Sequence, residues 1–125
     1  MNSDLTISVV IPAMNEEKGI GKVIKGVRDI LGETCEIIVV NDGSKDSTEK
    51  VAREAGATVV SHPYNLGNGA AVKSGLRAAT GDIILLMDAD GQHKPEDIPR
   101  LLEQLGQYDM VIGARTRESE TKLFK

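Results

Sequence analysis

The sequence is poor in the residues that several classes of protein require. It has a single cysteine, Cys35, among 125 residues, which excludes an internal disulfide and a zinc site built from cysteines. Aromatic residues make up 2% and tryptophan is absent, so a stacking surface for single-stranded nucleic acid is not expected. The net charge of −4 also argues against nucleic acid as the main partner.

Long apolar runs are missing as well. No stretch approaches the roughly 18 apolar residues of a transmembrane helix, and Met1–Asp4 lack the basic and then apolar pattern of a signal peptide. We therefore expect a cytoplasmic protein with no membrane span in this chain. Hydrophobic residues make up 40% and charged residues 27%, which is typical of a soluble globular domain.

Short apolar runs rich in valine and isoleucine alternate with helical patterns. Continuous runs of this kind are typical of strands in a sheet that is covered on both faces. The runs predict strands at 7–11, 37–40, 58–60, 83–87 and 110–112. The spacing of apolar residues predicts helices over about 20–31, 46–55, 68–79 and 99–105. This alternation predicts an α/β fold with a mostly parallel sheet and helices on both faces.

Polar side chains follow three of the predicted strands, at the edge where a parallel sheet binds its ligands. They lie in the segments Pro12–Glu17, Asn41–Ser44 and Asp88–Gln92. Three polar strand ends suggest one shared site, although the first two segments have structural alternatives. Glu16 and Glu17 either contact a ligand or open the first helix and stabilise its N-terminus. Asn41–Ser44 either binds the polar edge of a nucleoside or caps the second helix.

The sharpest feature is the pair Asp88 and Asp90. Residues two apart on an extended chain point to the same face, and Gln92 follows at the same spacing if the extension persists. A cation relieves the repulsion between two carboxylates, and an all-oxygen set of ligands suits Mg²⁺ or Mn²⁺ rather than zinc. The spacing alone leaves a simple turn open, because aspartate and glycine favour turns.

The segment Asn65–Ala70 is a glycine-rich stretch that leads into the third predicted helix. Its backbone N–H groups could hold a phosphate, or its small residues could pack closely against a neighbouring element. Four basic side chains are either partners of a diphosphate or solvated surface charges: Lys73, Arg77, Arg115 and Arg117. His62 and His93 have no partners at metal or triad spacing, so we expect both to be structural or exposed.

Taken in order, the segments resemble the glycosyltransferase family 2 enzymes of the GT-A fold, and most of all the dolichyl- and polyprenyl-phosphate sugar transferases. The matching segments are 9–17, 38–48, 65–71, 80–82 and 87–93. Each motif is modest, but five in the family order are specific. The resemblance implies a Rossmann-like GT-A sheet of order 3-2-1-4 with a fifth strand.

The resemblance also implies a role for individual residues. The nucleoside pocket would be lined by Pro12, Ala13, Asn15, Glu16 and Asp42, with Asp88 beside them. Asp88 and Asp90 would be the catalytic DXD motif that holds Mg²⁺ or Mn²⁺ on the diphosphate, and Gln92 would join the metal shell. Arg115 and Arg117 would contact the diphosphate.

The implied reaction is an inverting, metal-dependent transfer of a sugar from a UDP- or GDP-linked donor. The expected acceptor is a polyprenyl or dolichyl phosphate, or else a glycan, which places the protein in the cytoplasm or at the cytoplasmic face of a membrane. In the family a catalytic base and acceptor recognition lie further along the chain. Residues 1–114 are therefore expected to be the nucleotide-sugar-binding part, and 115–125 a polar tail where the domain is truncated.

Two alternatives stay open at this point. One is a nucleotide-sugar-binding fragment without catalytic activity. The other is a receiver-type signalling domain, which fits the length and the α/β alternation. A receiver needs an acidic pair after its first strand and a lysine after its fifth, whereas this chain has Pro12 and Ala13, and then Gly113–Arg115, at those places.

Overall fold

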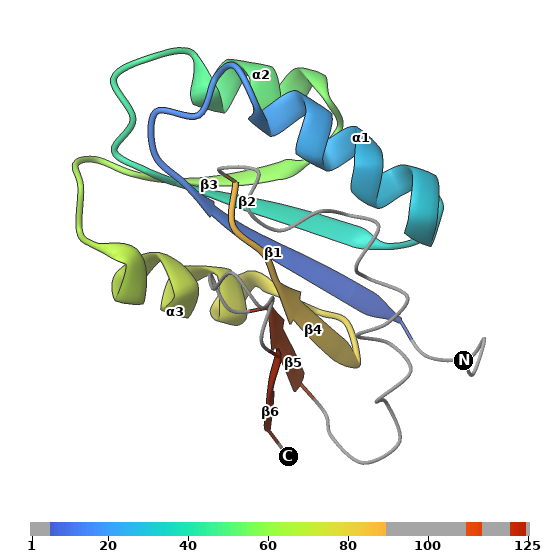
Figure 1. The fold of residues 1–125 in the computed structure, drawn as a ribbon. Helices are drawn as coiled ribbons and strands as arrows, with labels where there is room; N and C mark the ends of the chain where they lie inside the picture. Colours follow the sequence, from blue (N-terminus) through green and yellow to red (C-terminus); the bar gives the residue numbers. More distant parts are fainter. Residues whose placement is uncertain (1–5, 90–109, 114–120, 125) are drawn as a thin grey trace.

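The apolar runs form a six-stranded sheet at the centre of the protein (Figure 1). The computed structural model describes residues 6–89, 110–113 and 121–124. The strands are β1 (Ile7–Ala13), β2 (Glu36–Asp42), β3 (Thr58–His62), β4 (Ile83–Leu86), β5 (Met110–Gly113) and β6 (Thr121–Phe124). Their order is β3-β2-β1-β4-β5-β6, and β6 alone among these strands pairs antiparallel. The predicted order 3-2-1-4 is confirmed.

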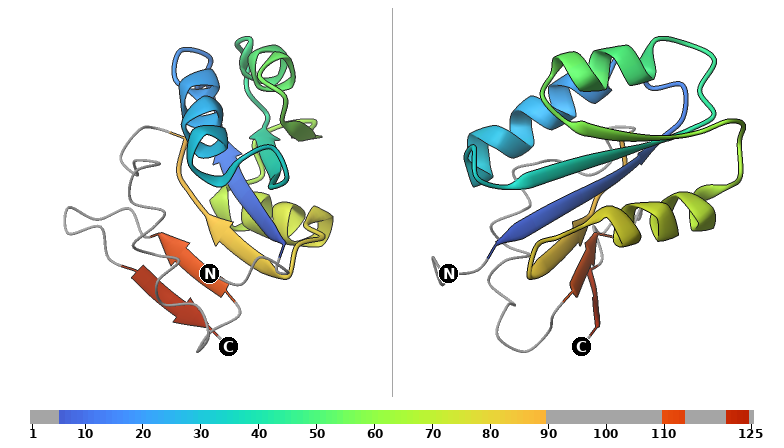
Figure 2. Two further views of the ribbon diagram at one scale, coloured as in Figure 1. Left: turned by 90° about the vertical axis from the view of Figure 1, so that its right-hand side faces the viewer. Right: turned by 180° about the vertical axis from the view of Figure 1, so that it is seen from behind.

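Helices cover both faces of the sheet, as the alternation predicts. The described helices are α1 (Ile20–Leu31), α2 (Thr48–Glu54) and α3 (Asn68–Ala78). Helices α1 and α2 lie on one face, and α3 lies on the other (Figures 1 and 2). Gly32 ends α1 with a φ of 82°, a conformation that glycine adopts without strain. The helix predicted over 99–105 lies outside the described residues.

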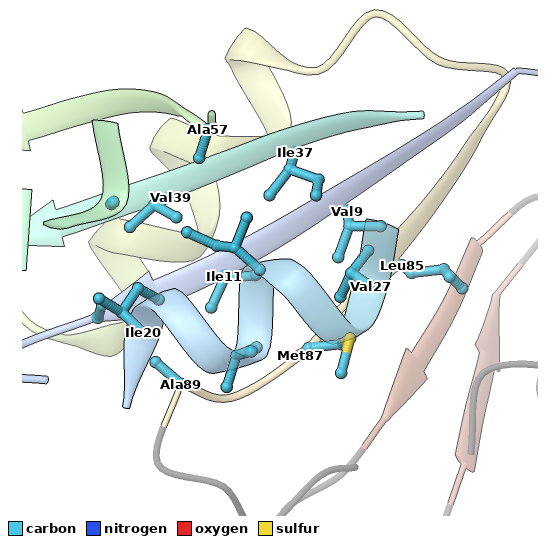
Figure 3. Packing of buried hydrophobic residues seen from close by; sticks show 14 of the residues in the cluster. Val9, Ile11, Ile20, Val27, Ile37, Val39, Ala57, Leu85, Met87 and Ala89 are labelled. Carbon is cyan, nitrogen blue, oxygen red and sulfur yellow. The ribbon is translucent and has the colours of Figure 1, made fainter. Parts of the chain in front are cut away.

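Side chains of β1 and β2 alternate between two apolar clusters, one on each face. The cluster under α1 and α2 includes Val9, Ile11, Ile37, Val39, Leu85, Ile20, Ile24 and Val27 (Figure 3). The cluster under α3 contains Val10, Ile38, Val40, Ala71 and Leu86. Because both faces are covered, the central strands need apolar residues at consecutive positions, which explains their continuous apolar runs.

Two features differ from the sequence prediction. Glu16 and Glu17 do not open α1, since the helix begins at Ile20 and its first turn contains no acidic residue. The carbonyl of Glu16 instead accepts hydrogen bonds from the N–H groups of Gly19 and Ile20. Strand β6 was not predicted, because four residues of mixed polarity carry little periodic signal; it pairs with β5 and lies within the stretch expected to be a polar tail.

The segment Thr80–Asp82 joins the start of β4 to the neighbouring strand β1 and to β2 beyond it. The Ser8 hydroxyl accepts a hydrogen bond from the N–H of Gly81 at 2.8 Å and donates to Glu36 Oε1 at 2.7 Å. Glu36 Oε1 also accepts from the N–H of Thr80 at 2.9 Å. These contacts set where β4 starts along the sheet, and therefore where its carboxyl end, with Asp88, arrives.

No helix within the described ranges combines the length and the apolar character needed to cross a bilayer.

Gly75 sets how closely α3 approaches the sheet. A Cβ at this position would lie 2.2 Å from Val10 Cγ1 and 3.2 Å from Val40 Cγ2, both in the buried cluster. Gly69 on the same helix has no atom within 4 Å of an added Cβ. Any residue larger than glycine at position 75 must therefore push the helix away from β1.

We expect Gly75→Ala to lower the free energy of unfolding by about 1–2 kcal/mol, because overpacking outweighs the better helix propensity of alanine. Gly69→Ala, the matched control, should be neutral or stabilising by up to about 1 kcal/mol. Urea unfolding measures both changes. Val10→Ala should lower the free energy of unfolding less in the Gly75→Ala chain than in the parent chain, because it removes the side chain that clashes. An equal loss in the two chains would contradict the proposed clash.

Candidate functional site

A pocket of about 200 Å³ lies at the carboxyl end of the parallel strands. Its lining residues come from the ends of β1, β2 and β4, from the β3–α3 loop and from the first turns of α3: Pro12, Ala13, Met14, Glu16, Asp42, Asn65, Gly67, Asn68, Ala71 and Ala89. This is the edge where an open α/β sheet binds its ligands. Of the residues expected to form a nucleoside pocket, Pro12, Ala13, Glu16 and Asp42 line it.

Asn15 holds the β1–α1 loop in place from beside the pocket. Its backbone has a φ of 54°, a left-handed conformation that asparagine tolerates better than most residues. Its N–H donates to the Ser44 hydroxyl at 2.8 Å, and its Oδ1 accepts from the N–H of Lys45 at 2.8 Å. Asn15 therefore joins the β1–α1 loop to the β2–α2 loop.

Further polar residues continue this joint. The N–H of Glu16 donates to the Thr48 hydroxyl at 2.8 Å, and the N–H of Ser47 donates to Glu17 Oε2 at 3.1 Å. Asp46 accepts from the hydroxyl and the N–H of Thr48 and from the N–H of Glu17. The hydrogen bond from the Thr48 hydroxyl is the main reason that the pKa of Asp46 is lowered. Asp46 thus accepts the first N–H of α2, and Thr48 at the start of that helix positions Glu16.

Asp42, at the end of β2, is buried and carries the densest set of hydrogen bonds at the pocket. Its Oδ1 bonds to His62 Nδ1 at 2.8 Å and accepts from the N–H of Leu66 at 2.9 Å. Its Oδ2 accepts from the N–H of Gly67 at 3.0 Å. Burial raises the pKa of Asp42, but these hydrogen bonds outweigh burial and the pKa is lowered overall. Asp42 is therefore a buried carboxylate that anchors the β3–α3 loop.

His62 has two hydrogen-bond partners that its spacing in the sequence did not indicate, and they agree with the structural role expected for it. Its Nδ1 bonds to Asp42, and its Nε2 lies 2.8 Å from the Ser74 hydroxyl on α3. The parallel register of β2 and β3 places His62 directly beside Asp42. Linear spacing could not reveal this pair, because the two residues lie 20 positions apart and meet only in the sheet.

Gly43 permits the β3–α3 loop to lie against the end of β2. Its φ is +75°, and a Cβ there would lie 2.4 Å from the backbone N of Asn65 and 2.4 Å from the carbonyl carbon of Tyr64. Neither a side chain nor the left-handed backbone of a larger residue is tolerated at such a point. The pocket wall therefore depends on a glycine at position 43.

The metal-binding prediction is only partly within the described residues. Asp88 lies two residues after the end of β4 and is half-buried, and its neighbour Ala89 lines the pocket. Asp90, Gln92, Arg115 and Arg117 lie outside the described residues, as does His93. Within residues 6–89, no three histidine, cysteine, aspartate or glutamate side chains lie close enough together to hold a metal ion.

The glycine-rich stretch before α3 faces the pocket. Gly67 and Asn68 line it, and no acidic residue lies in the first turn of α3. Ala71 packs tightly and is fully buried, whereas Gly69 does not pack closely, because no atom lies within 4 Å of its Cβ position. The side chains of Lys73 and Arg77 on the same helix are exposed.

The comparison with protein families agrees with this geometry. The family described as "Glycosyl transferase family 2" matches residues 8–125. The chain belongs to glycosyl transferase family 2. The match spans the pocket residues and continues through residues 90–125, and it leaves no support for a receiver-type signalling domain.

Relatives of this family 2 chain include enzymes that are named for polyprenyl-phosphate acceptors. An undecaprenyl-phosphate 4-deoxy-4-formamido-L-arabinose transferase of Aeromonas hydrophila is 35% identical over 134 residues, which cover 99% of this chain and 41% of the relative. A dolichyl-phosphate beta-glucosyltransferase of Trichomonas vaginalis is 33% identical over 139 residues, which cover 95% of this chain and 42% of the relative. The chain thus spans less than half the length of these relatives.

Solved structures include a similar fold. The glucosyl-3-phosphoglycerate synthase of Mycobacterium tuberculosis, in complex with Mn²⁺, UDP and glucosyl-3-phosphoglycerate, has a TM-score of 0.70 at 38% identity. The alignment covers 81% of this chain and 39% of the synthase. The same synthase has also been solved with Mn²⁺ and UDP-glucose.

The close contact of Gly43 with the β3–α3 loop can be tested by comparing its substitution with that of Gly56, which has no atom near its Cβ position. We expect Gly43→Ala to lower the free energy of unfolding by about 3 kcal/mol, from left-handed strain and from overpacking against backbone. Gly56, with a φ of +97° and no atom within 4 Å of its Cβ position, is the control; Gly56→Ala should cost about 1 kcal/mol from strain alone. Equal losses in urea unfolding would show that the contact with Asn65 is unimportant.

The hydrogen bonds to Asp42 predict a pH-dependent loss of stability. Since the pKa of Asp42 is lowered on folding, its contribution is complete above about pH 4, the pKa of an unfolded aspartate, and is lost as the pH falls through the lowered value. Asp42→Asn should lower the free energy of unfolding, measured in urea, by about 1–3 kcal/mol at pH 7 and by less toward pH 3. Asp29→Asn, at an exposed aspartate on α1, is the control substitution measured over the same pH range. A cost of Asp42→Asn that is constant from pH 7 to pH 3 would contradict this account.

Proposed function

We propose that this family 2 chain is the nucleotide-sugar-binding part of an inverting, metal-dependent glycosyltransferase. The observation that carries the proposal is the pocket at the carboxyl ends of β1, β2 and β4, which combines a buried carboxylate with the start of a helix. The donor is a nucleoside diphosphate sugar, and the acceptor is a polyprenyl or dolichyl phosphate. Binding of the acceptor and transfer of the sugar are proposed for the whole protein, of which this chain supplies the part that binds the donor.

Asp42 is suited to bind the base of the donor. Its Oδ2 accepts one hydrogen bond from the protein, from the N–H of Gly67, so this oxygen keeps the capacity to accept another. Uracil and guanine both carry a ring N–H on the edge that such an acceptor would bind. Pro12 and Ala13 add an apolar floor at the end of β1, and Glu16 adds a second carboxylate at the pocket.

The start of α3 is suited to bind the diphosphate. Helix N-termini carry a partial positive charge and free N–H groups, which favour phosphate. Gly67 and Asn68 place this end of the helix at the pocket, and its first turn contains no acidic residue to oppose an anion. Arg115 and Arg117 remain candidates for further contacts to the diphosphate.

The residues after β4 fit a hard divalent cation. Asp88 and Asp90 offer carboxylate oxygens and Gln92 an amide oxygen, which are the ligands that Mg²⁺ and Mn²⁺ prefer. A cation held there would offset the negative charge that develops on the departing nucleoside diphosphate. A polyprenyl phosphate is already an anion, so it can attack the anomeric carbon without a base on this chain. That acceptor would place the protein at the cytoplasmic face of a membrane.

A binding fragment without turnover is the second candidate, because the chain spans 41% of the Aeromonas transferase. Sugar transfer from UDP- or GDP-sugars to a short polyprenyl phosphate, measured for this chain and for a longer reading frame, separates the two. Transfer by the longer chain alone would favour the binding fragment. Transfer by both would favour a complete catalytic unit.

Nucleotide binding tests the proposal directly. We expect UDP or GDP to bind the chain in isothermal titration calorimetry and to bind more tightly with Mn²⁺. Asp88→Asn should raise the Kd with Mn²⁺ about tenfold or more and leave the Kd in EDTA near that of the parent chain. Asp29→Asn, an exposed aspartate on α1, is the control and should bind as the parent chain does.

Two results would contradict the proposal. One is the absence of binding by either nucleotide with Mn²⁺ to a chain that circular dichroism shows to be folded. The other is an Asp88→Asn variant with an unchanged dependence on Mn²⁺, which would show that the carboxylate after β4 does not hold the cation.

A further inference from the structure

A line of hydrogen-bonded polar groups runs from α3 to the pocket wall. The Ser74 hydroxyl bonds to His62 Nε2, His62 Nδ1 bonds to Asp42, and Asp42 accepts the N–H groups of Leu66 and Gly67. The side chains of His62 and Asp42 are 9% and 7% exposed. The line therefore crosses three elements, β2, β3 and α3, and ends on the loop that carries Asn65 and Gly67 to the pocket.

The chemistry of these groups sets the direction of the bond to Asp42. An ionised carboxylate only accepts hydrogen bonds, so His62 Nδ1 is the donor to Asp42. The other ring nitrogen, Nε2, bonds to the Ser74 hydroxyl, which can both donate and accept. Both ring nitrogens are thus satisfied inside the protein, and the ring is held at both ends. A histidine held in this way orients the carboxylate that it contacts.

The other side of β3 offers a comparison. Ser61 precedes His62 and points to the opposite face, where its hydroxyl donates to Glu49 Oε1 at 2.8 Å and accepts from Asn41 Nδ2 at 3.2 Å. Ser61, Asn41 and Glu49 do not line the pocket. Two neighbouring residues of one strand therefore make similar polar contacts, and only those of His62 lead to the pocket.

We propose that His62 is a positioning residue of the nucleotide pocket, which acts by fixing the Asp42 carboxylate and, through it, the backbone of Leu66 and Gly67. The proposal rests on the proposed function, because it assigns His62 a part in binding the nucleoside diphosphate. Without the bond from Nδ1, the carboxylate loses one of its three protein donors and can rotate away from the loop. The pocket wall and the acceptor for the base would then be displaced together.

Two substitutions of His62 each keep one of its two hydrogen bonds and remove the other. In His62→Asn, the amide NH₂ can take the place of Nδ1 and keep the bond to Asp42. In His62→Gln, the longer side chain places its amide near Nε2, so the contact with Ser74 is kept and the bond to Asp42 is lost. We expect the Kd for UDP or GDP with Mn²⁺ to stay within about threefold of the parent chain in His62→Asn and to rise about tenfold in His62→Gln.

Ser61→Ala is the matched control, since it removes a comparable polar contact from the same strand. It should lower the stability in urea unfolding and leave the Kd unchanged. A purely structural role of His62 would make His62→Gln behave like Ser61→Ala, with lower stability and the Kd of the parent chain, and this result would overturn the proposal. An equal loss of affinity in His62→Asn and His62→Gln would also overturn it.

The parent chain distinguishes this proposal from the proposed function. Nucleotide binding by the parent chain with no difference among the variants would overturn the role of His62 alone. No binding by the parent chain would overturn both. Where His62→Gln does not fold, the test uses His62→Asn and Ser74→Ala, which both lose the bond between position 62 and Ser74 and keep the bond to Asp42. The Kd of both should stay within about threefold of the parent chain, and a tenfold rise in either would overturn the proposal.

Discussion

The carboxylate of Asp42 is the point on which the pocket depends. A charge in the interior is costly unless hydrogen bonds replace its water, and here the replacements come from His62 and from two backbone N–H groups of the β3–α3 loop. The need to satisfy that charge therefore draws the loop and the start of α3 toward the end of β2. Gly43 makes this approach possible, because no side chain fits between the strand end and the loop.

The opposite wall is also held by hydrogen bonds between two loops. Asn15, held in a left-handed conformation, bonds to Ser44 and Lys45, while Thr48 accepts the N–H of Glu16. Asn15 and Glu16, which the sequence predicts to bind the nucleoside, thus also hydrogen-bond one loop to the other. Each loop that lines the pocket is hydrogen-bonded to residues at or after the end of another strand. The loops are therefore held in place by the sheet beneath them.

Sequence patterns predicted most of the fold. The apolar runs located the strands because both faces of the sheet are covered, and the helical spacing of Ile20, Val23 and Ile24 predicted α1. Strand β6 was missed, because its pairing with β5 and not its own composition makes it a strand. Glu16 and Glu17 were misplaced as the start of α1, because acidic residues favour both helix starts and polar loops.

The sequence by itself determined the family, the sheet and the strand ends at which a ligand binds, because periodicity and motif order are properties of the linear chain. Only the tertiary structure decided which polar residues share the site. His62 and Ser74 lie 20 and 32 positions after Asp42, and no local pattern connects them. They meet because parallel strands place distant residues side by side, and because a buried carboxylate must find its hydrogen-bond donors among whatever the fold brings near it.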